Sequence, residues 1–214
     1  MVTFFKNYYR QLKDIISAII SPPFCEHCKI FLETRSVFCD ECKLLILPIV
    51  SHPLQIDPVF SVPVYAIGAY NGILKRLVMA KKYSNLLASH QLGQLLSQHV
   101  VWETIECDMV VAMPLGWREH ARQGYNPAHE MAKEIALARD VSLKSLLTKS
   151  QDNNGVFFTV NVELEQQSQY ANKHIVIVDD VMLNVLSLRE AVRSLQVLKP
   201  ASISILVASR SLVV

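Results

Sequence analysis

The sequence predicts an α/β protein in which helices flank a parallel β-sheet and a small four-cysteine module precedes the sheet. Three observations support this prediction. The 214 residues are 51% apolar and 19% charged, as in a folded domain with an ample core. Residues 175–178 form a continuous apolar run, typical of a strand buried on both faces, and a helical pattern follows at residues 188–198. Two Cys-x-x-Cys pairs, at residues 25–28 and 39–42, indicate the module.

We expect three segments along the chain: a helix at residues 1–20, the four-cysteine module at residues 21–53 and the α/β domain at residues 54–214. The first segment is amphipathic, and charged residues interrupt it before any apolar run reaches the roughly 18 residues of a membrane span. It also lacks the apolar core of a signal peptide, so we expect a cytoplasmic protein. In one interpretation the apolar side of this helix packs on the domain, and in the other it touches a membrane surface.

The four cysteines of the two pairs have the spacing of a metal site. Without a signal peptide the thiols are expected to stay reduced, which disfavours disulfides. Four thiolates at about 2.3 Å complete the tetrahedral coordination of zinc and leave no open position, so we expect a structural Zn²⁺. A redox dithiol is the alternative, His27 and His52 are further candidate ligands, and Cys107 is expected to be a buried, inert thiol. The expected zinc ligands are Cys25, Cys28, Cys39 and Cys42.

Strand and helix patterns alternate through the rest of the chain. Pro58 and Pro63 predict that the strand pattern of residues 59–70 is an edge strand of the sheet or a strand of a separate hood, because proline cannot donate to a central ladder. Asn126 and Pro127 have the pattern of an N-cap followed by the first helical residue. The other expected elements are helices at residues 73–79, 86–102 and 127–138, a buried strand at 109–113 and a polar loop at 118–125.

A basic group lies on the helix that begins at residue 73. It is either a solvated helix face or a contact for phosphate or single-stranded nucleic acid. The net charge of +2 gives no general support for nucleic-acid binding. The members of the group are Lys75, Arg76, Lys81 and Lys82.

Asp179 and Asp180 directly follow the buried strand. In open α/β sheets ligands bind where strands end and helices begin, and two adjacent carboxylates there can accept hydrogen bonds from the vicinal hydroxyls of a sugar. The alternative is that they cap the next helix. The stretch Val178-Asp179-Asp180-Val181-Met182 resembles the phosphoribosyl-pyrophosphate motif of type I phosphoribosyltransferases.

In that family the two acids hold the ribose hydroxyls, and a loop rich in Thr and Gly then wraps the 5′-phosphate. Here Leu183 and Val185 depart from the loop pattern, while Asn184 and Ser187 keep polar atoms. A β-branched residue is poorly suited to the positive φ that glycine supplies in such a loop. The resemblance therefore implies the fold and a remnant ribose-phosphate site, with Mg²⁺ needed only if phosphoribosyl pyrophosphate binds.

The order of motifs along nearly the whole chain resembles the competence protein F family, which combines a four-cysteine zinc module with a phosphoribosyltransferase-like domain. In that family an arginine usually stands at the position of Gln123, and an arginine-rich stretch usually covers residues 149–170, which here contain none. The motifs that carry the resemblance are the cysteine pairs, Tyr70-Asn71-Gly72, Met113-Pro114-Leu115, Arg122-Gln123-Gly124-Tyr125-Asn126-Pro127 and Val178-Asp179-Asp180.

Three functions remain open at this stage. The first is a non-catalytic competence factor for DNA uptake, with a helicase and single-stranded DNA as partners. The second is an active phosphoribosyltransferase. The third is a structural relative of these enzymes that binds no ligand. The candidate anion contacts are Arg118, Arg122 and Lys75, and Gly124 is expected to supply a special backbone conformation.

Overall fold

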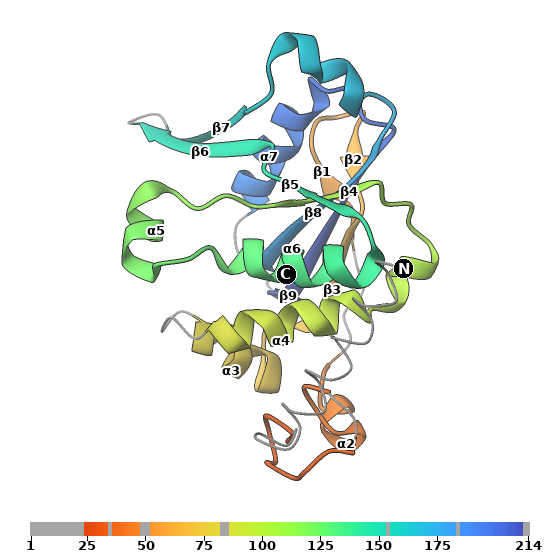
Figure 1. The fold of residues 1–214 in the computed structure, drawn as a ribbon, viewed down its shortest axis with the longest axis vertical. Helices are drawn as coiled ribbons and strands as arrows, with labels where there is room; N and C mark the ends of the chain where they lie inside the picture. Colours follow the sequence, from red (N-terminus) through yellow and green to blue (C-terminus); the bar gives the residue numbers. More distant parts are fainter. Residues whose placement is uncertain are drawn as a thin grey trace, which may run out of the picture. The chain divides into compact units, whose positions relative to one another are not determined.

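The computed structural model describes residues 24–33, 36–47, 52–81, 86–152, 155–182 and 185–211. The chain divides into two compact units, Met1–Leu45 and Ile46–Val214 (Figure 1). The helix expected at residues 1–20 lies outside the described residues. Within the described part, no helix combines the length and the apolar character that a membrane crossing requires.

The first unit contains the four cysteines, and the residues of it that the structure describes, 24–33 and 36–45, form little regular structure. Phe24 and Phe31 form an isolated antiparallel bridge across the first cysteine pair. In the second pair, Cys39 is the N-cap of the short helix α2 (Asp40–Lys43) and Cys42 lies within it, and the Cys39 sulfur accepts a hydrogen bond from the Cys42 N–H. The first pair is therefore brought together by a turn and the second by the start of a helix.

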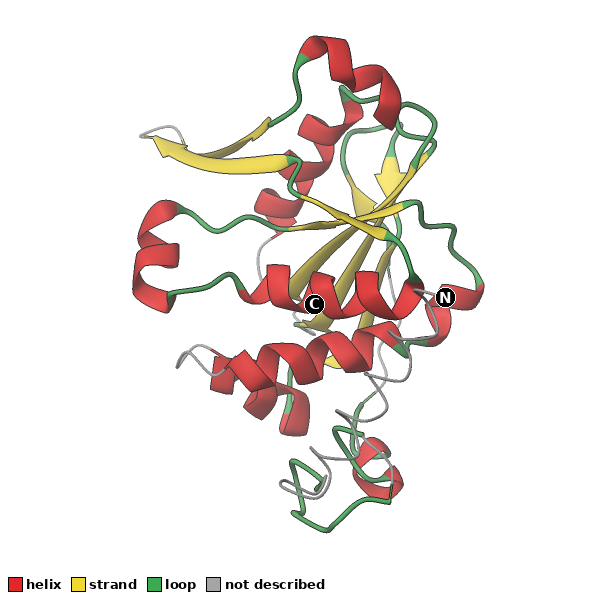
Figure 2. Cartoon of the chain, viewed as in Figure 1, coloured by secondary structure: helices red, strands yellow, loops and turns green. Residues whose placement is uncertain are grey.

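The second unit is built on a five-stranded sheet with strand order β3-β9-β8-β4-β5, in which every neighbouring pair is parallel (Figure 2). The described elements of this unit are β1 (Leu54–Gln55), β2 (Ser61–Val62), β3 (Val64–Ala69), α3 (Gly72–Lys81), α4 (Leu86–Ser97), the 3₁₀ helix η1 (Val100–Glu103), β4 (Met109–Ala112), α5 (Trp117–Gln123), α6 (Pro127–Arg139), β5 (Ser142–Lys144), β6 (Leu147–Asp152), β7 (Gly155–Val160), the 3₁₀ helix η2 (Leu164–Tyr170), β8 (His174–Met182), α7 (Val185–Gln196) and β9 (Ser202–Arg210).

Strand β8 forms the centre of the sheet, between β4 and β9. Its residues 175–178 are at most 1% exposed, which confirms the prediction of a strand buried on both faces. The strand is longer than its apolar run, however, because β9 continues beside it as far as the pair Met182 and Arg210. Asp179 and Asp180 therefore lie inside β8 rather than after it, which corrects the predicted boundary.

Helices cover both faces of this sheet (Figure 1). On one face α6 packs on β4 and β8, and α4 packs closely on α6. A Cβ added to Gly93 of α4 would lie 2.8 Å from the Cβ of Glu134, so glycine permits this close approach. On the other face α7 buries Leu188, Ala191, Val192 and Leu195.

Two segments differ from the sequence prediction. The stretch 118–125, expected to be a polar loop, is mostly the helix α5, which buries none of its residues and so shows no apolar periodicity in the sequence. The predicted strand 59–70 is divided at Pro63: β2 pairs with β1 in a small antiparallel hairpin, while β3 is an edge strand of the main sheet. The edge position agrees with the prediction.

Candidate functional site

The four cysteine sulfurs form a cluster in the first unit, with all four atoms within 4.8 Å of one another. Cys25 and Cys42 are buried, and the sulfurs of Cys28 and Cys39 are 3.7 Å apart. Tetrahedral coordination with zinc–sulfur distances of about 2.3 Å requires sulfur–sulfur distances of about 3.8 Å, so the cluster fits this ion with small adjustments. The predicted grouping of the four cysteines is confirmed.

The local environment of Cys25 favours a thiolate, the form that binds metal. Burial alone would raise the pKa of Cys25, but backbone hydrogen bonds from Cys28, Cys39 and His27 lower it to about 6. Cys107 lies in the other unit, half-buried, and burial raises the pKa of its thiol to about 11. The expectation of an unreactive thiol at Cys107 agrees with this environment, although the residue is less buried than predicted.

The candidate ligand site of the second unit lies at the carboxyl edge of the sheet. Ala112, the last residue of β4, pairs with Val178 of β8, and the Met113 N–H donates to the Val178 carbonyl oxygen at 2.9 Å. From these neighbouring positions, strand β8 continues into Asp179 and Asp180, and strand β4 is followed by the loop that leads to α5. The topology thus brings the two sequence motifs to one edge of the sheet.

Asp179 and Asp180 are both half-buried. The Asp180 N–H donates to Asp179 Oδ1 at 2.8 Å, and the Val181 N–H donates to Asp180 Oδ1 at 2.6 Å. Of the other two predicted ribose-phosphate residues, Asn184 lies outside the described residues and Ser187 is the third residue of α7. The roles assigned to these four residues stay predictions.

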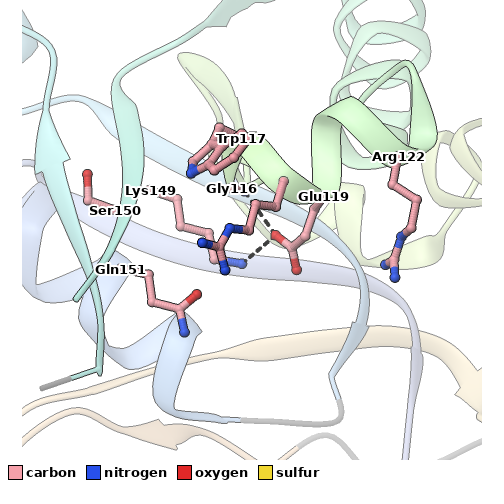
Figure 3. A pocket seen from close by; sticks show the side chains of 8 residues that line it. Gly116, Trp117, Glu119, Arg122, Lys149, Ser150 and Gln151 are labelled. Carbon is pink, nitrogen blue, oxygen red and sulfur yellow. Dashed lines mark hydrogen bonds and ion pairs between the residues drawn. The ribbon is translucent and has the colours of Figure 1, made fainter. Parts of the chain in front are cut away.

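A cavity of about 890 Å³ opens between the start of α5 and strand β6 (Figure 3). It contains three cationic side chains, two of which, Arg118 and Arg122, were predicted anion contacts. Gly124 is not in the described lining; it ends α5 with φ +76°, which is the special backbone conformation expected for it. The described lining consists of Gly116, Trp117, Arg118, Glu119, Arg122, Lys149, Ser150 and Gln151.

An exposed aromatic ring and a guanidinium group lie next to one another at this cavity. The Trp117 side chain is 76% exposed, which is unusual for a large apolar residue, and the Arg118 guanidinium lies 5.3 Å from its ring centroid. Within the described part of the chain, neither Arg118 nor Arg122 forms an ion pair. An aromatic face and two unpaired guanidinium groups therefore meet solvent at one opening.

Glu119 and Lys149 point toward one another across the cavity (Figure 3). Lys149 Nζ lies 2.7 Å from Glu119 Oε2, and the Gly116 N–H donates to the same oxygen at 2.9 Å. Burial would raise the pKa of Glu119, but these two hydrogen bonds and the charges of Lys149 and Arg122 lower it below its usual value. Glu119 is therefore ionised at neutral pH.

The site is only partly visible in the sequence. Trp117, Glu119 and Lys149 were not predicted as site residues, and residues 149–170 had no assigned role. The turn pattern Asn153-Asn154-Gly155, followed by a stretch rich in β-branched and aromatic residues, could have indicated the β6–β7 hairpin that carries Lys149. Neither Asp179 nor Asp180 is among the described residues that line the cavity.

The basic group on α3 is a solvated face where the structure describes it. Lys75 and Arg76 are exposed, and the Lys75 ammonium lies 5.8 Å from the ring centroid of Tyr70. The side chain of Lys81 and all of Lys82 lie outside the described residues.

Comparisons with known proteins identify the fold of the second unit. The model of the phosphoribosyl transferase domain matches residues 121–211. No curated protein matches the chain. The chain therefore contains a phosphoribosyltransferase-like domain together with an N-terminal four-cysteine cluster, and the predicted fold class is confirmed.

Three solved structures are similar to parts of the chain. A hypothetical protein from Neisseria gonorrhoeae with bound ppGpp is 12% identical, with a TM-score of 0.40 over 57% of this chain and 67% of that one. A purine phosphoribosyltransferase from Pyrococcus horikoshii is 14% identical, with a TM-score of 0.38 over 64% and 82%. A hypoxanthine-guanine phosphoribosyl transferase from L. donovani is 16% identical, with a TM-score of 0.35 over 63% and 67%.

Proposed function

We propose that this protein is a non-catalytic factor of DNA uptake in natural transformation and that its phosphoribosyltransferase-like domain binds single-stranded DNA. The observation that carries this proposal is the cavity between α5 and β6, where an exposed tryptophan lies among three cationic side chains. The order of motifs shared with the competence protein F family supports the cellular process. It also supports a competence helicase as the protein partner.

The chemistry of the cavity suits a single strand. Proteins that bind single strands without sequence preference combine a cationic groove for the phosphates with aromatic rings on which bases stack. Arg118, Arg122 and Lys149 supply the positive charge, and Trp117 supplies an exposed ring. In duplex DNA the base faces are stacked inside the helix, so a ring of this kind favours unpaired bases.

The loop that follows β8 supports the absence of catalysis. Leu183 and Val185 stand where the family has hydroxyls and a glycine around the 5′-phosphate. Val185 is the first residue of α7, and its β-branched side chain is poorly suited to the positive φ that glycine supplies in such a loop. A weakened phosphate cradle is compatible with a domain that keeps the fold for another ligand.

The four-cysteine cluster has a structural role in this proposal. A Zn²⁺ ion held by Cys25, Cys28, Cys39 and Cys42 would have no open position for substrate, and its binding would stabilise a unit with a small core. When bound, the ion supplies folding free energy and no reaction chemistry.

Fluorescence anisotropy of a labelled single-stranded oligothymidine tests the DNA proposal. Trp117→Ala is expected to weaken binding by about 1–3 kcal/mol, the range measured for stacking of one base. Arg118→Gln and Arg122→Gln are each expected to lower the slope of log affinity against log salt by about 0.7. Lys133→Gln on α6 removes an exposed charge outside the described lining and serves as the control.

The same titration separates the cavity from the basic face of α3. Loss of binding in Arg76→Gln but not in Arg118→Gln would move the interface to α3 and contradict the assignment to the cavity. Equal affinity for single-stranded and duplex oligonucleotides would contradict a role for Trp117 in stacking.

A second candidate function is an active phosphoribosyltransferase that uses phosphoribosyl pyrophosphate and Mg²⁺. The observation that favours it is the pair Asp179 and Asp180, half-buried at the carboxyl edge of the central strand. Calorimetric titration with phosphoribosyl pyrophosphate and Mg²⁺ tests it, with Asp179→Asn and Asp180→Asn as controls. Micromolar binding that both variants lose would support the transferase, whereas no binding at millimolar ligand would exclude it.

A further inference from the structure

Glu119 is the one acidic residue in the described lining of the cavity. Its carboxylate is surrounded by groups that would also suit a phosphate: the Lys149 ammonium at 2.7 Å and the Gly116 N–H at 2.9 Å, both on the same oxygen. The charge available to a ligand is thereby reduced. Three positive side chains and one negative side chain leave a net charge of +2 at the site.

The ion pair is also the link between two elements far apart in the sequence. Glu119 belongs to α5 and Lys149 to β6 of the hairpin, and the Lys149 side chain is only 18% exposed while that of Glu119 is 43% exposed. Lys149 is thus the less exposed partner, and a phosphate that binds its ammonium group competes with the Glu119 carboxylate. Arg118 and Arg122, by contrast, form no ion pair among the described residues and meet a ligand directly.

We propose that Glu119 is a built-in competitor for Lys149: it lowers the affinity of the cavity for every phosphate group, so that only a terminal phosphomonoester gains appreciably from Lys149. This inference rests on the proposed function, in which the cavity binds phosphate groups of a single strand. A phosphodiester carries one negative charge, as the Glu119 carboxylate does, so exchanging one for the other beside Lys149 would add little binding free energy. A terminal phosphate carries close to two negative charges at neutral pH and three acceptor oxygens, and it therefore gains more from Lys149 than Glu119 does.

A purely structural role for Glu119 predicts a different behaviour. The hydrogen bond from the Gly116 N–H places Glu119 at the start of α5, where a carboxylate also stabilises the helix terminus. In Glu119→Gln the amide oxygen still accepts this hydrogen bond, but the negative charge beside Lys149 is gone. A structural residue would leave the affinity for DNA unchanged in this variant.

The test uses the full chain and two single-stranded oligothymidines, identical except for a 5′-hydroxyl or a 5′-phosphate, with the fluorophore at the 3′-end. The natural protein is expected to prefer the 5′-phosphate by about threefold to tenfold at low salt. Glu119→Gln is expected to bind both strands more tightly, each by a similar factor, and to keep the preference for the 5′-phosphate, because the second charge of the terminal phosphate still faces three cationic side chains. Glu103→Gln in η1 removes the same charge outside the described lining and is expected to change neither value.

Three outcomes decide the matter. Equal affinity of the natural protein for both oligonucleotides, or an unchanged affinity for both in Glu119→Gln, overturns the role of Glu119 while leaving DNA binding intact. Failure of both oligonucleotides to bind any variant overturns the proposed function instead. In that case calorimetry with inorganic pyrophosphate tests Glu119 separately. Tighter pyrophosphate binding by Glu119→Gln than by the natural protein would support the proposed competition for Lys149. Equal binding by both proteins, or no binding by either, would overturn it.

Discussion

The side-chain nitrogen Nδ2 of Asn126 donates a hydrogen bond to the carbonyl oxygen of Met113 at 2.9 Å. The other end of the same amide accepts hydrogen bonds from the N–H groups of Ala128 and His129, which are free at the start of α6. One residue therefore caps α6 and fixes the point where the chain leaves β4. The lining residues around the start of α5 begin at Gly116, three positions after Met113, so their placement depends on this contact.

Replacement of Asn126 by alanine removes both interactions at once. We expect Asn126→Ala to lower the free energy of unfolding by about 1–3 kcal/mol, which urea denaturation measures. Asn126→Asp keeps the acceptor oxygen of the cap but not the donor to Met113, so an intermediate loss is expected. A loss below about 0.5 kcal/mol in Asn126→Ala would show that neither hydrogen bond contributes appreciably.

Gly93 offers a prediction in which packing opposes helix propensity. Alanine is favoured over glycine by about 1 kcal/mol inside a helix, so propensity alone predicts stabilisation. A Cβ at this position would meet the Cβ of Glu134 at 2.8 Å and the backbone of Met131 at 3.0 Å. We therefore expect Gly93→Ala to destabilise the domain by about 1–3 kcal/mol.

Urea denaturation also tests Gly93→Ala. Leu87→Ala, on an exposed part of the same helix, is the control and is expected to remain within about 0.5 kcal/mol of the natural protein. Stabilisation by Gly93→Ala would mean that α4 and α6 separate easily.

Metal removal tests the four-cysteine cluster. We expect one zinc ion per chain in freshly purified, reduced protein, as measured by atomic emission. Chelation is expected to abolish hydrogen-exchange protection in the unit Met1–Leu45, because the ion supplies most of the folding free energy of so small a core. Cys42→Ser should lose the zinc and Cys107→Ser should retain it; zinc loss in both variants would contradict the assignment of ligands.

The pH dependence of stability has a source in Asp108, at the start of β4. The His174 N–H donates to this carboxylate at 2.8 Å and Lys173 donates at 3.1 Å, and together they lower the pKa of Asp108 below its usual value. Because the pKa is lower in the folded than in the unfolded state, the ionised carboxylate stabilises the fold above its unfolded pKa. That contribution is lost as the pH falls through the folded pKa.

Asp108→Asn is therefore expected to destabilise the protein at neutral pH. The difference from the natural protein should begin to shrink below about pH 4, where the carboxyl of the unfolded chain binds a proton, and should disappear only when the pH falls below the lowered pKa of the folded state. Urea denaturation at several pH values measures this difference. A difference that stays constant with pH would assign the loss to altered hydrogen-bond geometry instead of charge.

The sequence was informative wherever a short stretch determines its own structure. Residues 175–178 identified the central strand, and Asn126 with Pro127 identified the start of α6, because local chemistry alone determines these features. The end of β8 could not be placed, since Asp179 and Asp180 stay in the sheet only through pairing with β9. Helix α5 was missed because it is polar on all sides.

The chemistry of the cavity was predicted in part, for the same reason. Arg118 and Arg122 stand close together in the sequence and were recognised as a pair of anion contacts. Lys149 lies thirty positions after Glu119, and their ion pair forms only after the β6–β7 hairpin has folded beside α5. A contact of this kind leaves no pattern in a single sequence.

The position of β9 affects how the chain can fold during synthesis. It is the last of the described strands, yet it lies between β3 and β8, so β3 has no partner in the main sheet until residues 202–210 have left the ribosome. Until then the ribosome-bound domain presents two unsatisfied strand edges, the surfaces on which chaperones and aggregation compete. A nonsense mutation after α7 would delete an interior strand, so even a truncation near the C-terminus is expected to destroy the whole domain.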